Sequence, residues 1–171
     1  MKTPNLVLIA LLISVVNLSA QIPQFDWINS LSTPGSGPEE VDAFPADMVV
    51  DADGNSYHAG NYIRDILFSN GQTLLLGDFD VAAYVLKRDA NGNMLWAKSI
   101  QPTEAGISGL DYAIKIAVDN EGNVYVSGAL ADTGIKIDGL TLPGTSCIND
   151  CNGLFLMKLD QNGVPQWAKP I

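Results

Sequence analysis

Histidine, cysteine and basic residues are scarce in this chain of 171 residues. It has one histidine and two cysteines, and its nine Lys and Arg stand against nineteen Asp and Glu, a formal net charge of −10. These residues are too few for a zinc site built from His and Cys ligands. Nucleic acid and anionic lipid repel a surface this acidic, so we expect neither as a partner.

The residue patterns of common hydrolytic enzymes are also missing. The sequence contains no G-x-S-x-G, and the sole histidine, His58, is matched by Val126 in the internal repeat described below. The paired acids Glu39 and Glu40 lie in a Pro/Gly-rich stretch and are interpreted as solvated charge. The sequence therefore predicts a protein that is not an enzyme and that has no cofactor or metal site.

One long apolar run, Leu6 to Val16, lies near the N-terminus, after Lys2 and before the small residue Ala20. This layout is typical of a secretory signal peptide over residues 1–20, cleaved near Ala20. The run is too short to span a bilayer comfortably, and a buried N-terminal helix is the alternative. We expect a secreted or cell-surface protein with no membrane span after cleavage.

The two cysteines, Cys147 and Cys151, are separated by three residues. In an exported chain two nearby cysteines suggest a disulfide, which here would close a small loop. Redox sites usually have a shorter C-x-x-C spacing. We predict a structural disulfide, with free thiols or redox and metal chemistry as the alternatives.

A phrase of ten residues occurs twice, as DADGNSYHAG over Asp51–Gly60 and as DNEGNVYVSG over Asp119–Gly128. The match continues at the same spacing to the T-L pairs at Thr73 and Thr141. The second copy then has an insertion around the cysteines, after which the two copies match again over K-x-D-x-N-G and over W-A-K, which begins at Trp96 and Trp167. Trp27 lies one repeat earlier still. Such periodicity indicates a repeat architecture.

Each copy is expected to form four short antiparallel strands, because β-branched and aromatic runs alternate with Gly-containing turns. The expected strand pairs are Val49–Val50 with Ser56–Tyr62, Asp80–Arg88 with Asn93–Ile100, Ala113–Val118 with Asn123–Leu130, and Leu154–Leu159 with Val164–Lys169. The sequence thus predicts an all-β fold made of two four-stranded, blade-like propeller repeats, 44–100 and 101–171, after an N-terminal strand and linker over 21–43.

The phrases D-x-x-G-N-x-Y-x-x-G, K-x-D-x-N-G and W-A-K resemble the SBBP family of β-propeller repeats over residues 44 to 169. The end of the leader, S-A-Q, is similar to that of Bacteroidota secreted proteins. The resemblance implies type IX secretion and a propeller built from more units than two. We therefore expect an incomplete ring, an open sheet pair or arc, at the front of a longer protein whose partners include further repeats of the same chain.

The three tryptophans, Trp27, Trp96 and Trp167, recur at one repeat position and are predicted to pack between units rather than to bind sugar. The D-x-x-G-N phrases are predicted to be hairpin turns, with calcium loops as the alternative. Alternation of short and long connections should gather the long ones on one face. We place a binding face there, bordered by Glu39, Glu40, Asp132 and the Cys147–Cys151 loop.

Two functions remain open from the sequence. The first is a non-enzymatic, exported propeller-repeat segment that serves as scaffold or binding module of a larger surface protein, with an extracellular protein or glycan as partner. The alternative is the propeller domain of a secreted hydrolase or lyase that acts on polysaccharide.

Overall fold

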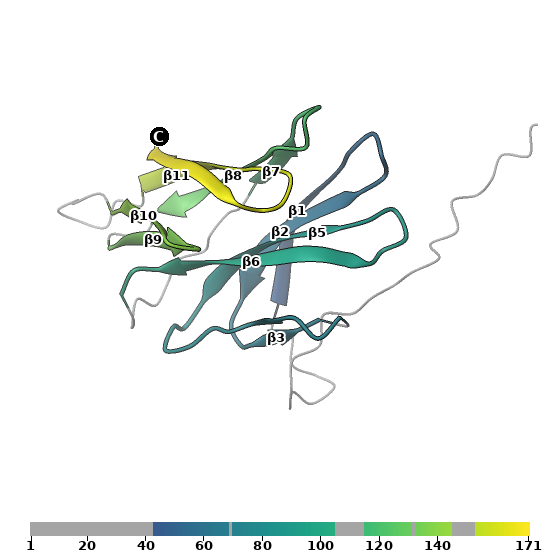
Figure 1. Ribbon diagram of the computed structural model, residues 1–171. Helices are drawn as coiled ribbons and strands as arrows, with labels where there is room; N and C mark the ends of the chain where they lie inside the picture. Colours follow the sequence, from purple (N-terminus) through teal and green to yellow (C-terminus); the bar gives the residue numbers. More distant parts are fainter. Residues whose placement is uncertain (1–42, 69, 105–114, 131–132, 145–152) are drawn as a thin grey trace, which may run out of the picture.

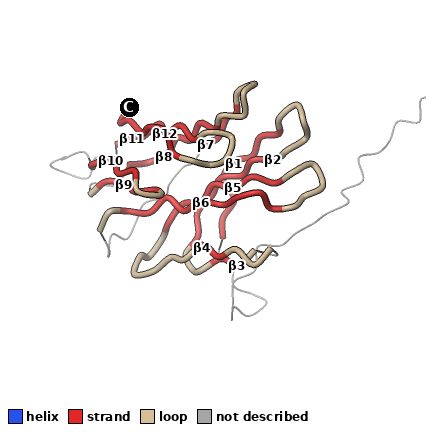
Figure 2. Tube along the Cα trace, in the orientation of Figure 1, coloured by secondary structure: helices blue, strands red, loops and turns tan. Residues whose placement is uncertain are grey.

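The computed structural model describes residues 43–68, 70–104, 115–130, 133–144 and 153–171, and all regular structure in these ranges is β-strand (Figures 1 and 2). The strands are β1 Ala43–Val50, β2 Ser56–Tyr62, β3 Ile66–Leu67, β4 Thr73–Leu74, β5 Ala82–Arg88, β6 Met94–Pro102, β7 Lys115–Val118, β8 Val124–Leu130, β9 Gly134–Ile137, β10 Leu140–Pro143, β11 Gly153–Leu159 and β12 Pro165–Pro170. The predicted all-β class and the eight predicted strand regions are confirmed. Over the same ranges no helix is long and apolar enough to cross a membrane.

The two sequence repeats follow one course through space. In the first, β1, β2, β5 and β6 lie side by side in chain order, and in the second β7, β8, β11 and β12 do the same. Neighbours are antiparallel throughout, with registers such as Ala59 opposite Val85 and Ser127 opposite Leu156. Short turns join the strands within each pair, as expected where a Gly-containing turn lies between alternating runs.

The long connections contain a second pair of hairpins that the sequence analysis interpreted as loops. Residues between β2 and β5 form the β3–β4 hairpin, and those between β8 and β11 form β9–β10. The two hairpins are repeat-equivalent, because Thr73-Leu74 matches Thr141-Leu142. Each strand of the β3–β4 hairpin has only two residues, which is too few for an alternation of apolar and polar side chains to indicate a strand.

The β9–β10 hairpin also changes the expected strand count, because it belongs to the sheet of the other repeat. β6 pairs with β5 only as far as Ile100, and its end, Gln101 and Pro102, pairs instead with β9. The first sheet therefore has six strands in the order β1-β2-β5-β6-β9-β10, and the second has four. The prediction of two separate four-stranded sheets was wrong in this respect, since an extended strand edge left unpaired recruits the next hairpin.

The main core lies between the two sheets, which stack as an open pair (Figure 1). One face of the first sheet contributes side chains such as Tyr57, Val85 and Trp96, and the second sheet contributes Val126 and Phe155. Alternation along each strand sends every second residue into this layer, so that burial of apolar surface holds the two repeats together. Asp47 on β1 adds a polar link by accepting a hydrogen bond from the backbone N–H of Ile116 on β7, at 3.2 Å.

A smaller core lies on the other face of the first sheet, beneath the β3–β4 hairpin. Phe68 and Leu74 from the hairpin region join Tyr62 and Tyr84 from the sheet in this cluster. The ring of Tyr84 lies over Gly60 on the neighbouring strand, where a β-carbon would come within 2.7 Å of the phenol. The short hairpin is therefore held by the sheet beneath it, because a hairpin of this size is only marginally stable alone.

Candidate functional site

Four turns of one design project from the same side of the two sheets, to the right in Figure 1. They follow Asp51, Asp89, Asp119 and Asp160, and in each the backbone N–H of the Gly three residues on donates to the carbonyl of the Asp. In each, the Asp Oδ1 also accepts the N–H groups two and four residues on, as in the 2.8–3.0 Å bonds of Asp89 and Asp160. The prediction that D-x-x-G-N forms a hairpin turn is confirmed.

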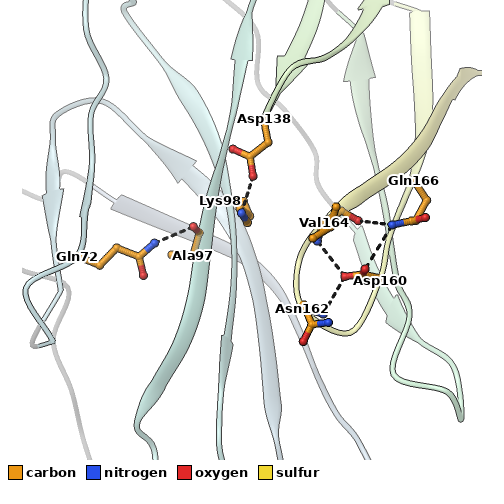
Figure 3. A network of polar contacts seen from close by, with 8 residues as sticks. All are labelled: Gln72, Ala97, Lys98, Asp138, Asp160, Asn162, Val164 and Gln166. Carbon is orange, nitrogen blue, oxygen red and sulfur yellow. Dashed lines mark hydrogen bonds and ion pairs between the residues drawn. The ribbon is translucent and has the colours of Figure 1, made fainter.

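The second carboxylate oxygen, Oδ2, of each Asp also accepts a hydrogen bond from a side chain. Asp51 Oδ2 accepts from the Asn55 side chain at 2.8 Å and from the Tyr57 hydroxyl at 3.0 Å. Where Val164 stands in place of the usual Asn, Gln166 Nε2 approaches Asp160 Oδ2 at 3.4 Å instead (Figure 3). These carboxylates point at the donors of their own turns, which is a structural role rather than that of a calcium ligand.

Hydrogen bonding lowers the pKa of the Asp51, Asp89 and Asp119 carboxyls. At Asp119 the Asn123 side chain is the largest cause, and it outweighs the opposing effect of burial. At Asp51 burial alone would raise the pKa, but the combined hydrogen bonds from Asn55, Tyr57 and Asp53 lower it below the usual value. A general acid for glycoside cleavage needs a raised pKa, so neither carboxyl suits that task.

A hollow of about 540 Å³ separates the first turns of the two repeats. Its lining includes four acidic residues, Asp51, Asp53, Asp119 and Glu121, together with Lys87 and Gln161. Lys87 lies over the ring of Tyr57, with its ammonium 4.9 Å from the ring centre. Because two of the four acids anchor turns, this turn hollow is largely a consequence of how the repeats are built.

A second hollow of about 580 Å³ lies on the opposite part of the molecule, where the two inserted hairpins flank β6. We call it the hairpin groove. Its lining consists of Gln72, Thr73, Leu74, Leu75, Ala97, Lys98, Ser99, Gln101, Lys136, Ile137, Asp138, Gly139 and Thr141. The groove exists because β9–β10 joins the first sheet, so that both repeats contribute a wall.

Side-chain amides tie the groove walls to the sheet. Gln72 Nε2 donates to the carbonyl of Ala97 at 3.0 Å (Figure 3), and Gln101 Nε2 donates to that of Leu75 at 2.8 Å. The ammonium of Lys98 meets the carboxylate of Asp138 across the groove (Figure 3). Leu75, which is 62% exposed, supplies an apolar rim. Lys136 also lines the groove, and its ammonium lies over the Phe79 ring at 4.9 Å from the ring centre. Amides, hydroxyls and few charged groups suit a ligand rich in hydrogen-bonding groups that carries no excess of positive charge.

The lone histidine has a partner that the sequence did not suggest. His58 Nε2 lies 3.0 Å from the Ser56 hydroxyl on the same face of β2. Burial lowers the pKa of His58, and the positive charge of Arg88 lowers it further. Ser56 is only 5% exposed, so a substrate could not reach its hydroxyl. We therefore interpret the contact between His58 and Ser56 as a structural hydrogen bond within the sheet.

The residues predicted to border a binding face cannot be compared with the structure. Glu39, Glu40, Asp132, Cys147, Cys151 and Trp27 all lie outside the described residues, so both the face and the disulfide stay predictions. Trp96 and Trp167 are described, and each packs at a tilt against the tyrosine of its own repeat, with ring centres 6.4 Å apart.

The hairpin groove was missed by the sequence analysis, although a signal for it was present. The matched segments Asn70–Leu74 and Asp138–Leu142 each place a turn former before Gly and then T-L. Both glycines adopt positive φ, 84° at Gly71 and 84° at Gly139, as hairpin turns require. The pairing of one hairpin with the other repeat's sheet depends on tertiary contact and left no sign in the sequence.

No protein-family model and no solved structure matches the chain. An uncharacterised WD repeat-containing protein of Acanthamoeba polyphaga mimivirus is 30% identical over 95 residues, which cover 50% of this chain and 6% of that protein. The repeated antiparallel sheets, together with this similarity, fit a β-propeller-type repeat.

Proposed function

We propose that this chain is a non-enzymatic, exported segment of propeller-type repeats that acts as a binding module within a larger secreted or cell-surface protein. The observation that carries the proposal is the hairpin groove, a hollow of about 580 Å³ whose two walls come from equivalent hairpins of successive repeats. A repeat protein that binds through the seam between units gains one such groove for each added unit.

The chemistry of the groove favours binding over catalysis. Among the described residues Asp138 is its only carboxylate, and Lys98 holds it in an ion pair. Polysaccharide hydrolysis by the usual route needs two carboxyl groups on opposite sides of the bond. The exposed Leu75 and the surrounding amides and hydroxyls suit a glycan chain or an extended protein segment, both of which present apolar faces beside hydrogen-bonding groups.

Export and family are part of the same proposal. They rest on the leader-like residues 1–20 and on the phrases shared with SBBP repeats, the latter also pointing to Bacteroidota and type IX secretion. An acidic chain with nineteen Asp and Glu is suited to solubility outside the cell and to partners that are neutral or cationic.

The proposal is tested by screening the full chain, after cleavage of the leader, against glycan and extracellular-protein arrays. Thr141→Arg places a long cationic side chain in the groove from an exposed position, and we expect it to weaken binding of any array hit about tenfold or more. Asn120→Arg, an exposed position in the turn hollow, is the matched control and should leave affinity unchanged.

Three results would count against the proposal. If Asn120→Arg abolished binding and Thr141→Arg did not, the binding site would be the turn hollow instead of the hairpin groove. No hit on either array would remove the binding role. Release of new reducing ends from a bound polysaccharide would show turnover, and would favour the alternative of a polysaccharide-acting enzyme.

A further inference from the structure

The contact between the two sheets is made by a defined face of the first one. This inner face carries Tyr57, Ala83, Val85 and Trp96, and all four are 9% exposed or less. They meet the apolar residues of the second sheet, among them Val126 and Phe155. In this molecule, the face is therefore complementary to a neighbouring repeat.

The same face is present a second time, on the outside of the molecule. The positions in the second repeat that match Tyr57, Ala83, Val85 and Trp96 are Tyr125, Leu154, Leu156 and Trp167. Leu154 is 51% exposed, and the other three are partly exposed. We call these four residues the outer face.

The outer face keeps the internal geometry of the inner one. The Tyr125–Trp167 ring centres lie 6.4 Å apart, the same distance as those of Tyr57 and Trp96. A lysine lies over the tyrosine ring in both, with Lys158 at 5.6 Å from the ring centre of Tyr125. The surface that fits a neighbouring repeat is thus already formed.

The two faces differ in what the tryptophan contacts. The indole of Trp96 lies against Gly163 and donates its N–H to the carbonyl of Gln161 at 3.1 Å, both residues belonging to the last turn of the second repeat. The indole N–H of Trp167 donates to no described residue. Trp167 therefore packs against a tyrosine as Trp96 does, but it lacks the contact that Trp96 makes with a D-x-N-G turn.

We propose that the outer face docks a further sheet of the same repeat type, and that Trp167 is seated on the glycine of that sheet's last turn. The proposal deepens the proposed function, on which it rests, by naming the partner of this face as another repeat unit. The matching contact inside the molecule supplies the geometry, since a heterologous, head-to-tail interface reuses one pair of surfaces at every junction.

A second copy of this chain is a poorer occupant than a further repeat. To dock in the same manner, the copy would have to present its first sheet where this molecule presents Val124, Val126 and Leu159. The matching residues of the first repeat are Ser56, His58 and Arg88, which are polar. The docking sheet is therefore expected to resemble the second repeat, with an apolar face.

The test is a tandem chain in which a second copy of residues 101–171 follows Ile171. Ile171 matches Ile100, so the junction to Gln101 is the one found between the two existing repeats. Leu154→Lys is introduced into both the parent and the tandem chain, and Leu95→Lys is the control because Leu95 has the same 51% exposure but lies on the first sheet. Urea unfolding is followed by circular dichroism and tryptophan fluorescence.

We expect the tandem chain to unfold in one transition at a higher urea concentration than the parent. Leu154→Lys should change the folding equilibrium constant of the parent by no more than about threefold, but lower that of the tandem chain at least about tenfold, since the position becomes buried there. Leu95→Lys should change either chain by no more than about threefold.

The proposal is overturned if Leu154→Lys is no more harmful than Leu95→Lys in the tandem chain, or if the added unit stays unfolded. It is also overturned if the parent self-associates in analytical ultracentrifugation and Leu154→Lys abolishes that association, because the occupant is then a second copy. None of these results involves the hairpin groove, whose binding is tested separately by Thr141→Arg.

Discussion

Trp96 and Gly163 lie in contact although they belong to different repeats and different sheets. A β-carbon at Gly163 would come within 2.8 Å of the Trp96 ring, and the glycine also has a φ of 77°. Gly163 therefore serves two purposes, since it forms the left-handed position of a hairpin turn and leaves room for an indole from the neighbouring sheet. The turn glycine of one repeat is thereby part of the packing of another.

This relationship predicts that Gly163→Ala destabilises the chain more than the turn conformation alone explains. Left-handed strain contributes about 1 kcal/mol, and displacement of the Trp96 ring adds about 2 kcal/mol. Gly71→Ala is the matched control, because Gly71 has a φ of 84° and an added β-carbon would meet nothing within 4 Å. Urea unfolding of both variants checks the difference, and equal losses would contradict a packing role for Gly163.

The anchoring carboxylates predict a loss of stability in acid. The pKa of Asp51, Asp89 and Asp119 is lowered in the folded chain, so each contributes stability that is complete above the unfolded pKa of about 3.9 and is lost as the pH falls through the folded pKa. Between about pH 5 and pH 7 these groups contribute in full, so we expect them to cause no change of the urea midpoint with pH there, and we expect the midpoint to fall below about pH 4.

Asp51→Asn isolates one of these contributions. It should cost about 1 kcal/mol at neutral pH, allowing for solvent screening at a partly exposed site, and should make the acid fall in the urea midpoint shallower. Asp53→Asn in the same turn is the control, because no described residue donates a hydrogen bond to the Asp53 carboxylate. If the urea midpoint of Asp51→Asn fell in acid as steeply as that of the parent chain, the turn aspartates would not be the cause of the fall.

The buried tyrosines predict a second loss of stability in alkali. Burial raises the pKa of Tyr84 to about 12, and burial followed by the hydrogen bond to Asp51 raises the pKa of Tyr57. Burial also raises the pKa of Tyr62. Because the unfolded chain ionises its tyrosines near pH 10 and the folded chain does so later, stability falls as the pH rises above about 10.

Ultraviolet absorbance of tyrosinate checks this expectation directly. At about pH 11 the folded chain should show markedly less tyrosinate than the same chain unfolded in urea, and Tyr84→Phe should narrow the gap. Equal tyrosinate absorbance in the folded and unfolded chains would show that the buried phenols are more accessible than the structure indicates.

Local features of the fold followed from the sequence because they are made by residues close together in the chain. The Asp51 turn is closed by Asn55 and Tyr57, within six residues, and each contact recurs at Asp119. Strand positions followed in the same way, since alternation of buried and exposed side chains is set by the backbone period of two. The interpretation of D-x-x-G-N as a turn rests on these short-range bonds.

Contacts between distant residues were not available to the same reasoning. The pairing of Gln101 with Lys136 makes the first sheet six-stranded and creates the hairpin groove, and nothing in either segment specifies the other. The hydrogen bond from Trp96 to Gln161 spans 65 positions in sequence. The sequence predicts that Trp96 packs between units, but not which residue accepts a bond from its indole N–H. His58 and Ser56 are near in sequence, yet their contact depends on burial that the sheet provides.

The sequence by itself thus determined the repeat, the four main strands of each copy and the four aspartate turns, because these features depend on hydrogen bonds over a few residues and on the two-residue period of a strand. Only the tertiary structure decided that a hairpin of one repeat completes the sheet of the other, and that equivalent faces end up buried in one repeat and exposed in the next. Those outcomes depend on which apolar surfaces meet, and this is a property of the folded arrangement as a whole.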